Sequence, residues 1–122
     1  MKIQNKIFPK LEGKAILSPM AGVTDVAFRS LCKKYGASMT CTEFLNSIAI
    51  NRKNKKTLNM LKTDPMENPK QIQLFGNSIK ELIKSAKFVE KYFDIIDINC
   101  GCPAWKVIKT RAGSELMKNP DE

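Results

Sequence analysis

The sequence contains no histidine. A serine or cysteine nucleophile that depends on a histidine base therefore cannot be assembled within this chain. A zinc site is also disfavoured, because no two of the four cysteines have the two-residue spacing that zinc ligands usually show. These cysteines are Cys32, Cys41, Cys100 and Cys102. We expect no bound metal.

Long apolar runs are also absent. None approaches the roughly 18 residues that a membrane-spanning helix needs, and residues 1–6 lack the apolar core of a signal peptide. Neither the Gly-x-Gly-x-x-Gly fingerprint of dinucleotide-binding folds nor a P-loop occurs. Four cysteines in a chain of 122 residues do not indicate a secreted disulfide scaffold. The sequence therefore predicts a cytoplasmic protein that does not enter a membrane.

The charge is strongly positive, with 21 Lys and Arg against 12 Asp and Glu, a net charge of +9. This excess favours a polyanionic partner, above all nucleic acid. A lysine-rich composition without any such partner would give the same excess. The length and the 43% of hydrophobic residues predict one domain with a real core.

Short apolar strands alternate with amphipathic helices along the whole chain. The strands are expected at residues 14–18, 38–44, 71–75 and 94–99. The helices are expected at residues 25–35, over part of 45–62, from Ser78 to about 93, and around 105–117. Ser78 and Glu81 have the spacing of a capping box, in which each side chain bonds to the other's backbone N–H. This alternation predicts parallel strands covered by helices.

Two α/β architectures fit this alternation: an open doubly wound sheet, and part of a (β/α)₈ TIM barrel. A whole barrel takes about 250 residues. About four βα units within residues 1–122 would form the N-terminal half of a barrel, and we expect a truncated chain.

Three of the predicted strand ends carry residues suited to binding or chemistry. They are Pro19-Met20-Ala21-Gly22, Gln73, and the segment from Asn99 to Pro103. The carboxyl ends of barrel strands meet on one face, where catalytic groups lie. A glutamine offers a donor and an acceptor to the edge of a heterocycle. Taken singly, Met20 could belong to the core, Gln73 could cap a loop, and Cys102 could be a small buried hydrophobe.

Several motifs together resemble the tRNA-dihydrouridine synthases, over about residues 14 to 121. These motifs are Pro19-Met20-Ala21-Gly22-Val23-Thr24-Asp25, Thr42-Glu43, Ile72-Gln73-Leu74-Phe75-Gly76, and Asp97-Ile98-Asn99-Cys100-Gly101-Cys102-Pro103 with Lys106-Val107 and Ala112-Gly113-Ser114 after it. Other flavin barrels, such as dihydroorotate dehydrogenases, share a similar Asn…Cys-Pro turn.

The resemblance implies an enzyme that reduces uridine to dihydrouridine in tRNA, with FMN as cofactor and NADPH or NADH as reductant. Pro19, Met20 and Ala21 would line the FMN, and Gln73 would bond to its ring.

The same resemblance assigns the substrate contacts. Asn99 would face the flavin and the uracil, Cys102 would be the proton donor, and Lys106 would lie near RNA phosphate. Hydride addition at C6 of uracil leaves C5 to be protonated. An ordinary cysteine thiol, with a pKa of about 8.5, is mostly protonated at neutral pH and can serve as that acid.

The family's C-terminal half-barrel and its helical RNA-binding domain have no counterpart in these 122 residues. We therefore expect the chain alone to bind FMN weakly or not at all, and to be inactive. Two unpaired strand edges would favour self-association. Two alternatives remain open: a flavin dehydrogenase acting on a free pyrimidine, and a non-catalytic half-barrel that binds RNA or a partner chain.

Overall fold

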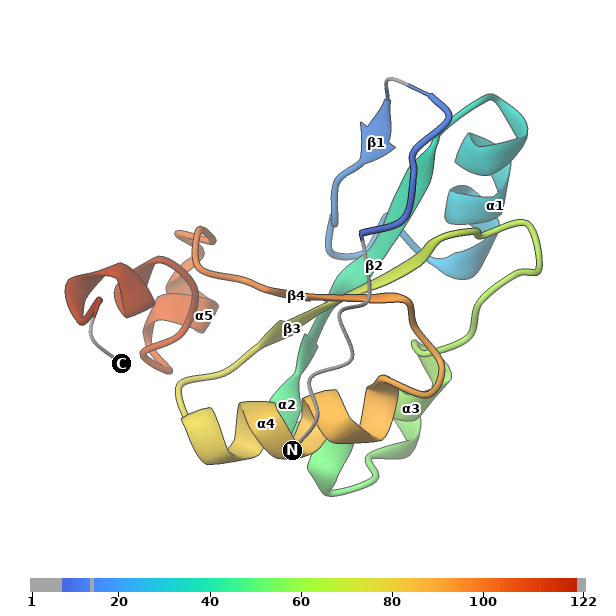
Figure 1. Cartoon of the computed structure of the whole chain (residues 1–122). Helices are drawn as coiled ribbons and strands as arrows, with labels where there is room; N and C mark the ends of the chain where they lie inside the picture. Colours follow the sequence, from blue (N-terminus) through green and yellow to red (C-terminus); the bar gives the residue numbers. More distant parts are fainter. Residues whose placement is uncertain (1–7, 14, 121–122) are drawn as a thin grey trace.

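The computed structural model, which describes residues 8–13 and 15–120, contains one sheet of four parallel strands (Figure 1). The strands are β1 (Ile16–Leu17), β2 (Met39–Asn46), β3 (Lys70–Phe75) and β4 (Ile95–Ile98). Their order in the sheet is the order of the sequence, β1-β2-β3-β4. Such an order has no point at which the strand order reverses, as a doubly wound sheet would require. The predicted half-barrel of parallel βα units is therefore confirmed.

The strand boundaries follow the prediction to within two residues where the structure describes them. Lys14, expected to open the first strand, lies outside the described residues, as do residues 1–6, in which no apolar signal-peptide core was expected. None of the described helices is long and apolar enough to cross a membrane.

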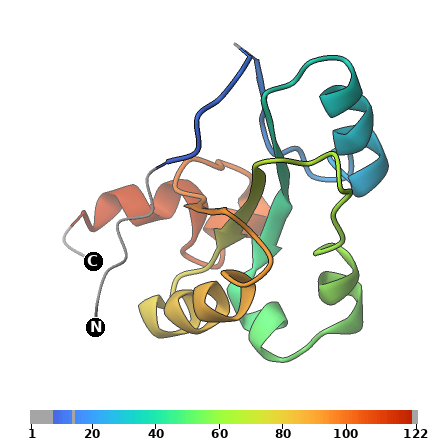
Figure 2. The ribbon, with the colours of Figure 1, turned by 45° about the vertical axis from the view of Figure 1, so that its right-hand side comes forward.

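Helices occupy the connections as predicted (Figures 1 and 2). They are α1 (Val26–Lys34), α2 (Ser47–Asn51), α3 (Lys55–Asn59), α4 (Ile79–Val89), α5 (Trp105–Ile108) and the 3₁₀ helix η1 (Gly113–Lys118). Both views show α2, α3 and α4 grouped along one side of the strands, with α1 beside the amino-terminal part of β2. The α5 and η1 segments lie beyond the carboxyl end of β4.

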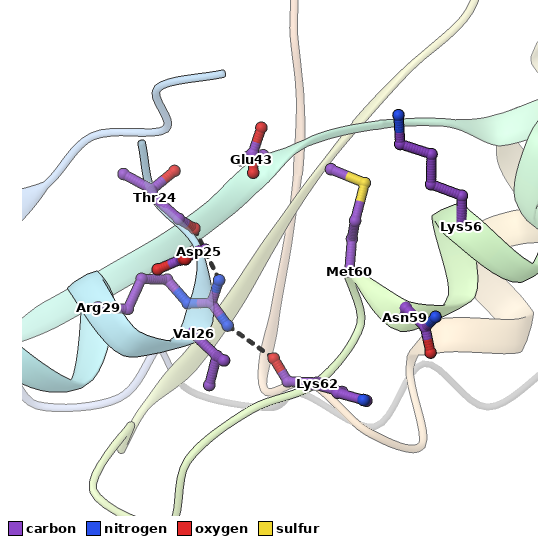
Figure 3. Close-up of a pocket in the computed structure, with 9 residues that line it drawn as sticks. All are labelled: Thr24, Asp25, Val26, Arg29, Glu43, Lys56, Asn59, Met60 and Lys62. Carbon is purple, nitrogen blue, oxygen red and sulfur yellow. Dashed lines mark hydrogen bonds between the residues drawn. The ribbon is translucent and has the colours of Figure 1, made fainter. Parts of the chain in front are cut away.

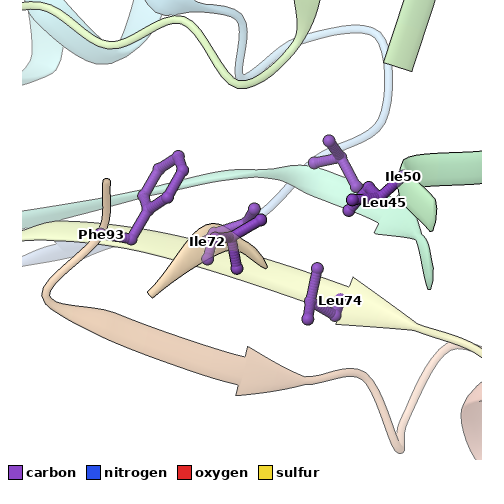
Figure 4. Packing of buried hydrophobic residues seen from close by; sticks show 6 residues of the cluster. Leu45, Ile50, Ile72, Leu74 and Phe93 are labelled. Atoms are coloured by element: carbon purple, nitrogen blue, oxygen red, sulfur yellow. The ribbon is translucent and has the colours of Figure 1, made fainter. Parts of the chain in front are cut away.

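The hydrophobic core lies between the sheet and the helices α2 and α4. Its buried members are Leu45, Ile50, Ile72, Leu74, Val89 and Phe93, and Figure 4 shows how the residues of this cluster pack. Successive side chains of a strand point to opposite faces of the sheet. Because Leu45, Ile72 and Leu74 face the helices, Gln73 lies on the other face, which in a closed barrel is the interior. The fold thus directs the polar site residue away from the core.

A β-bulge interrupts the pairing of β2 with β3. Cys41 pairs with Gln71 and Phe44 pairs with Gln73, so β2 has two residues where β3 has one. Bulges of this kind locally bend a strand and turn its side chains in new directions, often beside active sites. One of these two residues of β2 is Glu43, whose side chain contributes to the site described below.

The buried residue of α1 is a charged one, Arg29. The larger apolar side chains of the helix, Phe28 and Leu31, are 36% and 49% exposed. Its guanidinium bonds to the Glu67 carboxylate at 2.6 and 3.3 Å. A charged side chain tolerates such burial only when it is paired and hydrogen-bonded. The pairing with Glu67 explains why an arginine replaces apolar residues here.

The capping box at the start of α4 is half formed. The Glu81 N–H donates to the Ser78 hydroxyl at 3.4 Å, as predicted. The Glu81 carboxylate does not return to the backbone of Ser78 and instead accepts from Asn51 Nδ2 at 2.6 Å. Asn51 also donates to the Glu81 carbonyl. The carboxylate therefore ties α4 to α2, because a side-chain amide donor reaches it from the neighbouring helix.

Candidate functional site

The predicted flavin-binding turn is fixed by a threonine that follows it. The fully buried Thr24 hydroxyl accepts from the Met20 N–H at 3.0 Å and donates to the Met20 carbonyl at 3.1 Å. The Met20 side chain is 40% exposed, and Pro19 and Ala21 beside it are also accessible. The turn after β1 therefore combines a fixed backbone with an open surface.

A second anchor joins the same turn to the bulge of β2. The Gly22 N–H donates to the Glu43 carboxylate. Gly22 has a φ of +74°. Residues that carry a side chain rarely adopt this backbone angle, so a glycine is favoured at this point of the turn. The bulge and the turn are thus coupled through one carboxylate.

Three side chains from β3, β4 and the residue after β4 form a continuous hydrogen-bonded series. Gln73 Nε2 donates to Asp97 Oδ2 at 2.7 Å, and Asn99 Nδ2 donates to Gln73 Oε1 at 2.9 Å. Gln73 and Asn99 are buried, at 8% and 9% exposure. The Asn99 N–H donates to the Leu74 carbonyl at 2.8 Å and continues the ladder between β3 and β4. The two amides therefore lie at the carboxyl end of the sheet, as the sequence predicts.

The turn that carries Cys102 is held from two sides. Asn99 Oδ1 accepts from the Cys102 N–H at 3.0 Å and from the Gly101 N–H at 3.3 Å. On the other side the Ser114 N–H donates to the Cys102 carbonyl at 3.1 Å. A side chain at Gly113 would bring its Cβ within 2.6 Å of that carbonyl oxygen, so only glycine permits this approach. Cys102, held in this turn, is half-buried.

The structure brings together some of the predicted site residues and leaves others apart. Gln73, Asn99 and the backbone of Cys102 form one network. Lys106 is exposed on α5, and its side chain makes no hydrogen bond to the described part of the chain. No hydrogen bond within residues 8–13 and 15–120 links the turn of Pro19–Ala21 to Cys102.

The second cysteine near the site, Cys41, is more deeply buried than Cys102. Cys41 is 1% exposed, and its burial, together with the negative charge of Asp97, raises its pKa to about 12. A thiol with such a pKa stays protonated and unreactive at neutral pH. Cys41 is therefore a packing residue, and Cys100 is exposed on the turn.

A cavity of about 270 Å³ borders the predicted flavin turn through Thr24 and Glu43 (Figure 3). Arg29 donates to the carbonyls of Thr24 and Lys62, so the guanidinium joins α1 to the segment after α3. None of the predicted flavin or substrate contacts lines this cavity. Over the ranges that the structure describes, no three His, Cys, Asp or Glu side chains are grouped as a metal site requires.

Comparison with known proteins identifies the family. The sequence profile described as "Dihydrouridine synthase (Dus)" matches residues 16–122. The chain belongs to the dihydrouridine synthase family. It is 42% identical over 122 residues to tRNA-dihydrouridine synthase B of Vibrio vulnificus (strain CMCP6), covering 99% of this chain and 37% of that protein.

Two further relatives bear the same name. The protein from Shewanella oneidensis is 42% identical over 112 residues, 91% of this chain and 35% of its own length. That from Escherichia coli (strain K12) is 40% identical over 114 residues, 92% of this chain and 35% of its own length. The chain thus spans little more than a third of the curated relatives that it matches.

Three residues of the site were not assigned a role from the dihydrouridine synthase motifs. They are Thr24, Glu43 and Asp97. Asp97 gives the clearest signal in the sequence, because it is a charged residue within an otherwise apolar strand. Thr24 and Glu43 stand within family motifs, but the contacts that they make depend on the bulge in β2.

Proposed function

We propose that this chain is the part of a tRNA-dihydrouridine synthase that carries the proton donor, Cys102. The observation that carries the proposal is the pair of hydrogen bonds from the Gly101 and Cys102 N–H groups to Asn99 Oδ1. They present a half-buried thiol at the carboxyl end of β4, next to the amide of Gln73. In barrel enzymes this end of the sheet is the catalytic face.

The residues present fit the ring of FMN. Pro19, Met20 and Ala21 would lie against it, since their backbone is fixed and their surface is open. Toward residues 8–13 and 15–120, the Gln73 amide uses one N–H and one lone pair, so a second donor and a second acceptor are available for the ring. When bound and reduced, with NADPH or NADH as the electron source, FMN would supply a hydride for C6 of uracil.

The chain's own contribution to the reaction is the proton for C5. Cys102 would donate it from Sγ to the carbon made basic by hydride addition, and Asn99 would keep that thiol in place while also facing the uracil. The uridine must first leave its stack to reach such a site. Lys106, exposed on α5, is suited to contact the RNA phosphates.

The proposed partner is tRNA, and a net charge of +9 supports it. A tRNA substrate also fits the cytoplasmic location that the sequence suggests. Among the residues that the structure describes, β1 and β4 each have one edge without a neighbouring strand, and we further propose that the isolated chain self-associates. Mass measurement in solution tests this: dimers or larger species are expected, and a monomer across the whole concentration range would contradict it.

We propose that this chain needs the rest of the barrel to bind FMN tightly and to be active. Flavin titration and an activity assay of the isolated chain test this proposal. We expect weak or no binding of FMN and no dihydrouridine, because the rest of the barrel would have to supply the phosphate site. Tight binding of one FMN per chain, or turnover of unmodified tRNA, would contradict this part of the proposal.

A further inference from the structure

We infer that Asp97 is a positioning residue that sets the direction of the hydrogen bonds running through Gln73 and Asn99 to the backbone of Cys102. The inference rests on the proposed role of Cys102 as proton donor. Asp97 would not touch substrate or cofactor, and would act only through the two amides.

The two ends of this series have opposite hydrogen-bonding character. At one end, the carboxylate of Asp97 can only accept. At the other end, the backbone N–H groups of Gly101 and Cys102 can only donate. Every group between these ends must therefore present a donor toward Asp97 and an acceptor toward the turn.

The amides of Gln73 and Asn99 satisfy this requirement in one orientation only. Gln73 directs Nε2 to Asp97 at 2.7 Å, which leaves Oε1 to accept from Asn99 Nδ2 at 2.9 Å. Asn99 then has Oδ1 free for the turn, at 3.0 Å from the Cys102 nitrogen. Rotating either amide by half a turn would place two donors or two acceptors against each other, inside a site where both side chains are more than nine-tenths buried.

Asp97 is well placed for this role. It is the register partner of Gln73 across β3 and β4, so the two side chains lie on the same face of the sheet. Neither of the ion pairs found in the described part of the chain involves Asp97, and its hydrogen-bonded partner is Gln73. Its negative charge also acts on the nearby Cys41 thiol, whose pKa it helps to raise.

Exchanging the polarity between the two side chains tests the inference. In Gln73→Glu, the new carboxylate faces that of Asp97, and the series cannot form as it stands. In Gln73→Glu with Asp97→Asn, the Asn amide can donate to the Glu carboxylate, which can still accept from Asn99 Nδ2. The double variant therefore pairs the two side chains again, with the bond between positions 73 and 97 reversed and with the bonds of Asn99 to position 73 and to the turn unchanged in direction. The negative charge moves from position 97 to its register partner at position 73.

The readout is amide hydrogen exchange of the full 122-residue chain, followed by NMR. The Cys102 N–H reports the bond to Asn99 Oδ1, and the Asn99 N–H, bonded to Leu74, reports the ladder between β3 and β4. We expect the Cys102 amide to exchange about five to ten times faster in Gln73→Glu, the effect of losing roughly one hydrogen bond. In the double variant its rate should return to within about twofold of the parent chain.

Two results would overturn the inference. One is a Cys102 amide that exchanges at the parental rate in Gln73→Glu. The other is a double variant in which the Cys102 amide stays as fast as in Gln73→Glu, whether or not the Asn99 amide is protected. Neither readout involves flavin or tRNA, so the positioning role of Asp97 and the proposed enzymatic function can fail independently.

Discussion

Arg29 and Glu67 form a buried ion pair, with Arg29 Nε 2.6 Å from Glu67 Oε2 and both side chains at most 2% exposed. Glu67 also accepts from the Asp64 N–H and from the Thr40 hydroxyl. The pair joins α1 to the loop before β3 and, through Thr40, to β2. It thereby supports the base of the turn that is predicted to hold the flavin, because Arg29 also donates to the Thr24 carbonyl.

Removing one partner of this pair should destabilise the fold strongly. Arg29→Met leaves the Glu67 carboxylate buried without its counter-charge, and we expect a loss of about 3–5 kcal/mol in the free energy of unfolding. Arg29→Met with Glu67→Leu should recover a large part of that loss, because no buried charge remains. Urea unfolding measures the free energy of unfolding of the single and the double variant. A single variant within about 1 kcal/mol of the parent chain would show that the pair is unimportant.

The hydroxyl of Thr24 should be needed for the turn at Met20. Thr24→Val keeps the shape of the side chain and loses both hydrogen bonds, at an expected cost of about 1 kcal/mol. Hydrogen exchange of the Met20 amide should accelerate in Thr24→Val and remain near the parental rate in Thr24→Ser. Equal rates in the two variants would mean that another group holds the turn.

Gly113 and Gly101 offer a matched pair of substitutions beside Cys102. At Gly113, with φ +65°, a Cβ would lie 2.6 Å from the Cys102 carbonyl oxygen and 2.8 Å from Val107 Cγ1, so Gly113→Ala should destabilise by on the order of 2 kcal/mol. At Gly101 nothing lies within 4 Å, and Gly101→Ala should change stability little. Thermal unfolding compares them. Similar losses for both variants would contradict the close packing of Gly113 against Cys102.

Stability should fall at alkaline pH because of Cys41. Folding raises its pKa from 9.0 to about 12, so between these values the unfolded thiol ionises while the folded thiol keeps its proton. The folded state then binds more protons, and the free energy of unfolding falls by up to about 1.4 kcal/mol per pH unit from this residue. Cys41→Ala should show a shallower decline above pH 9. Parallel declines would show that Cys41 does not contribute.

Much of the fold could be predicted from local sequence. Strand and helix periods, together with glycine and proline at their ends, determine where Gln73 and Asn99 lie. The carboxyl ends of neighbouring parallel strands meet by geometry, which places these two amides together. The identity of the buried residue of α1 could not be predicted, because the partner of Arg29 stands 38 residues away, at Glu67.

The bulge in β2 and the direction of the amide series could not be predicted either. A bulge depends on how two strands pair, so it cannot be predicted from the sequence of either strand alone. Because the contact between Glu43 and Gly22 depends on the bulge, that contact could not be predicted either. Asp97 is a charged residue in an apolar strand, but its partner is evident only from the register of β3 with β4.

Cys102 is proposed to supply the proton for uridine reduction. A full-length enzyme, made by joining this chain to the remaining part of the Vibrio vulnificus relative, tests this role. With the unsubstituted chimera as reference, dihydrouridine formed in unmodified tRNA is measured for Cys102→Ala and for the matched control Cys100→Ala. We expect Cys102→Ala to lose at least about a hundredfold in turnover while retaining its bound flavin, and Cys100→Ala to remain active. Undiminished turnover in Cys102→Ala would show that Cys102 is not the proton donor.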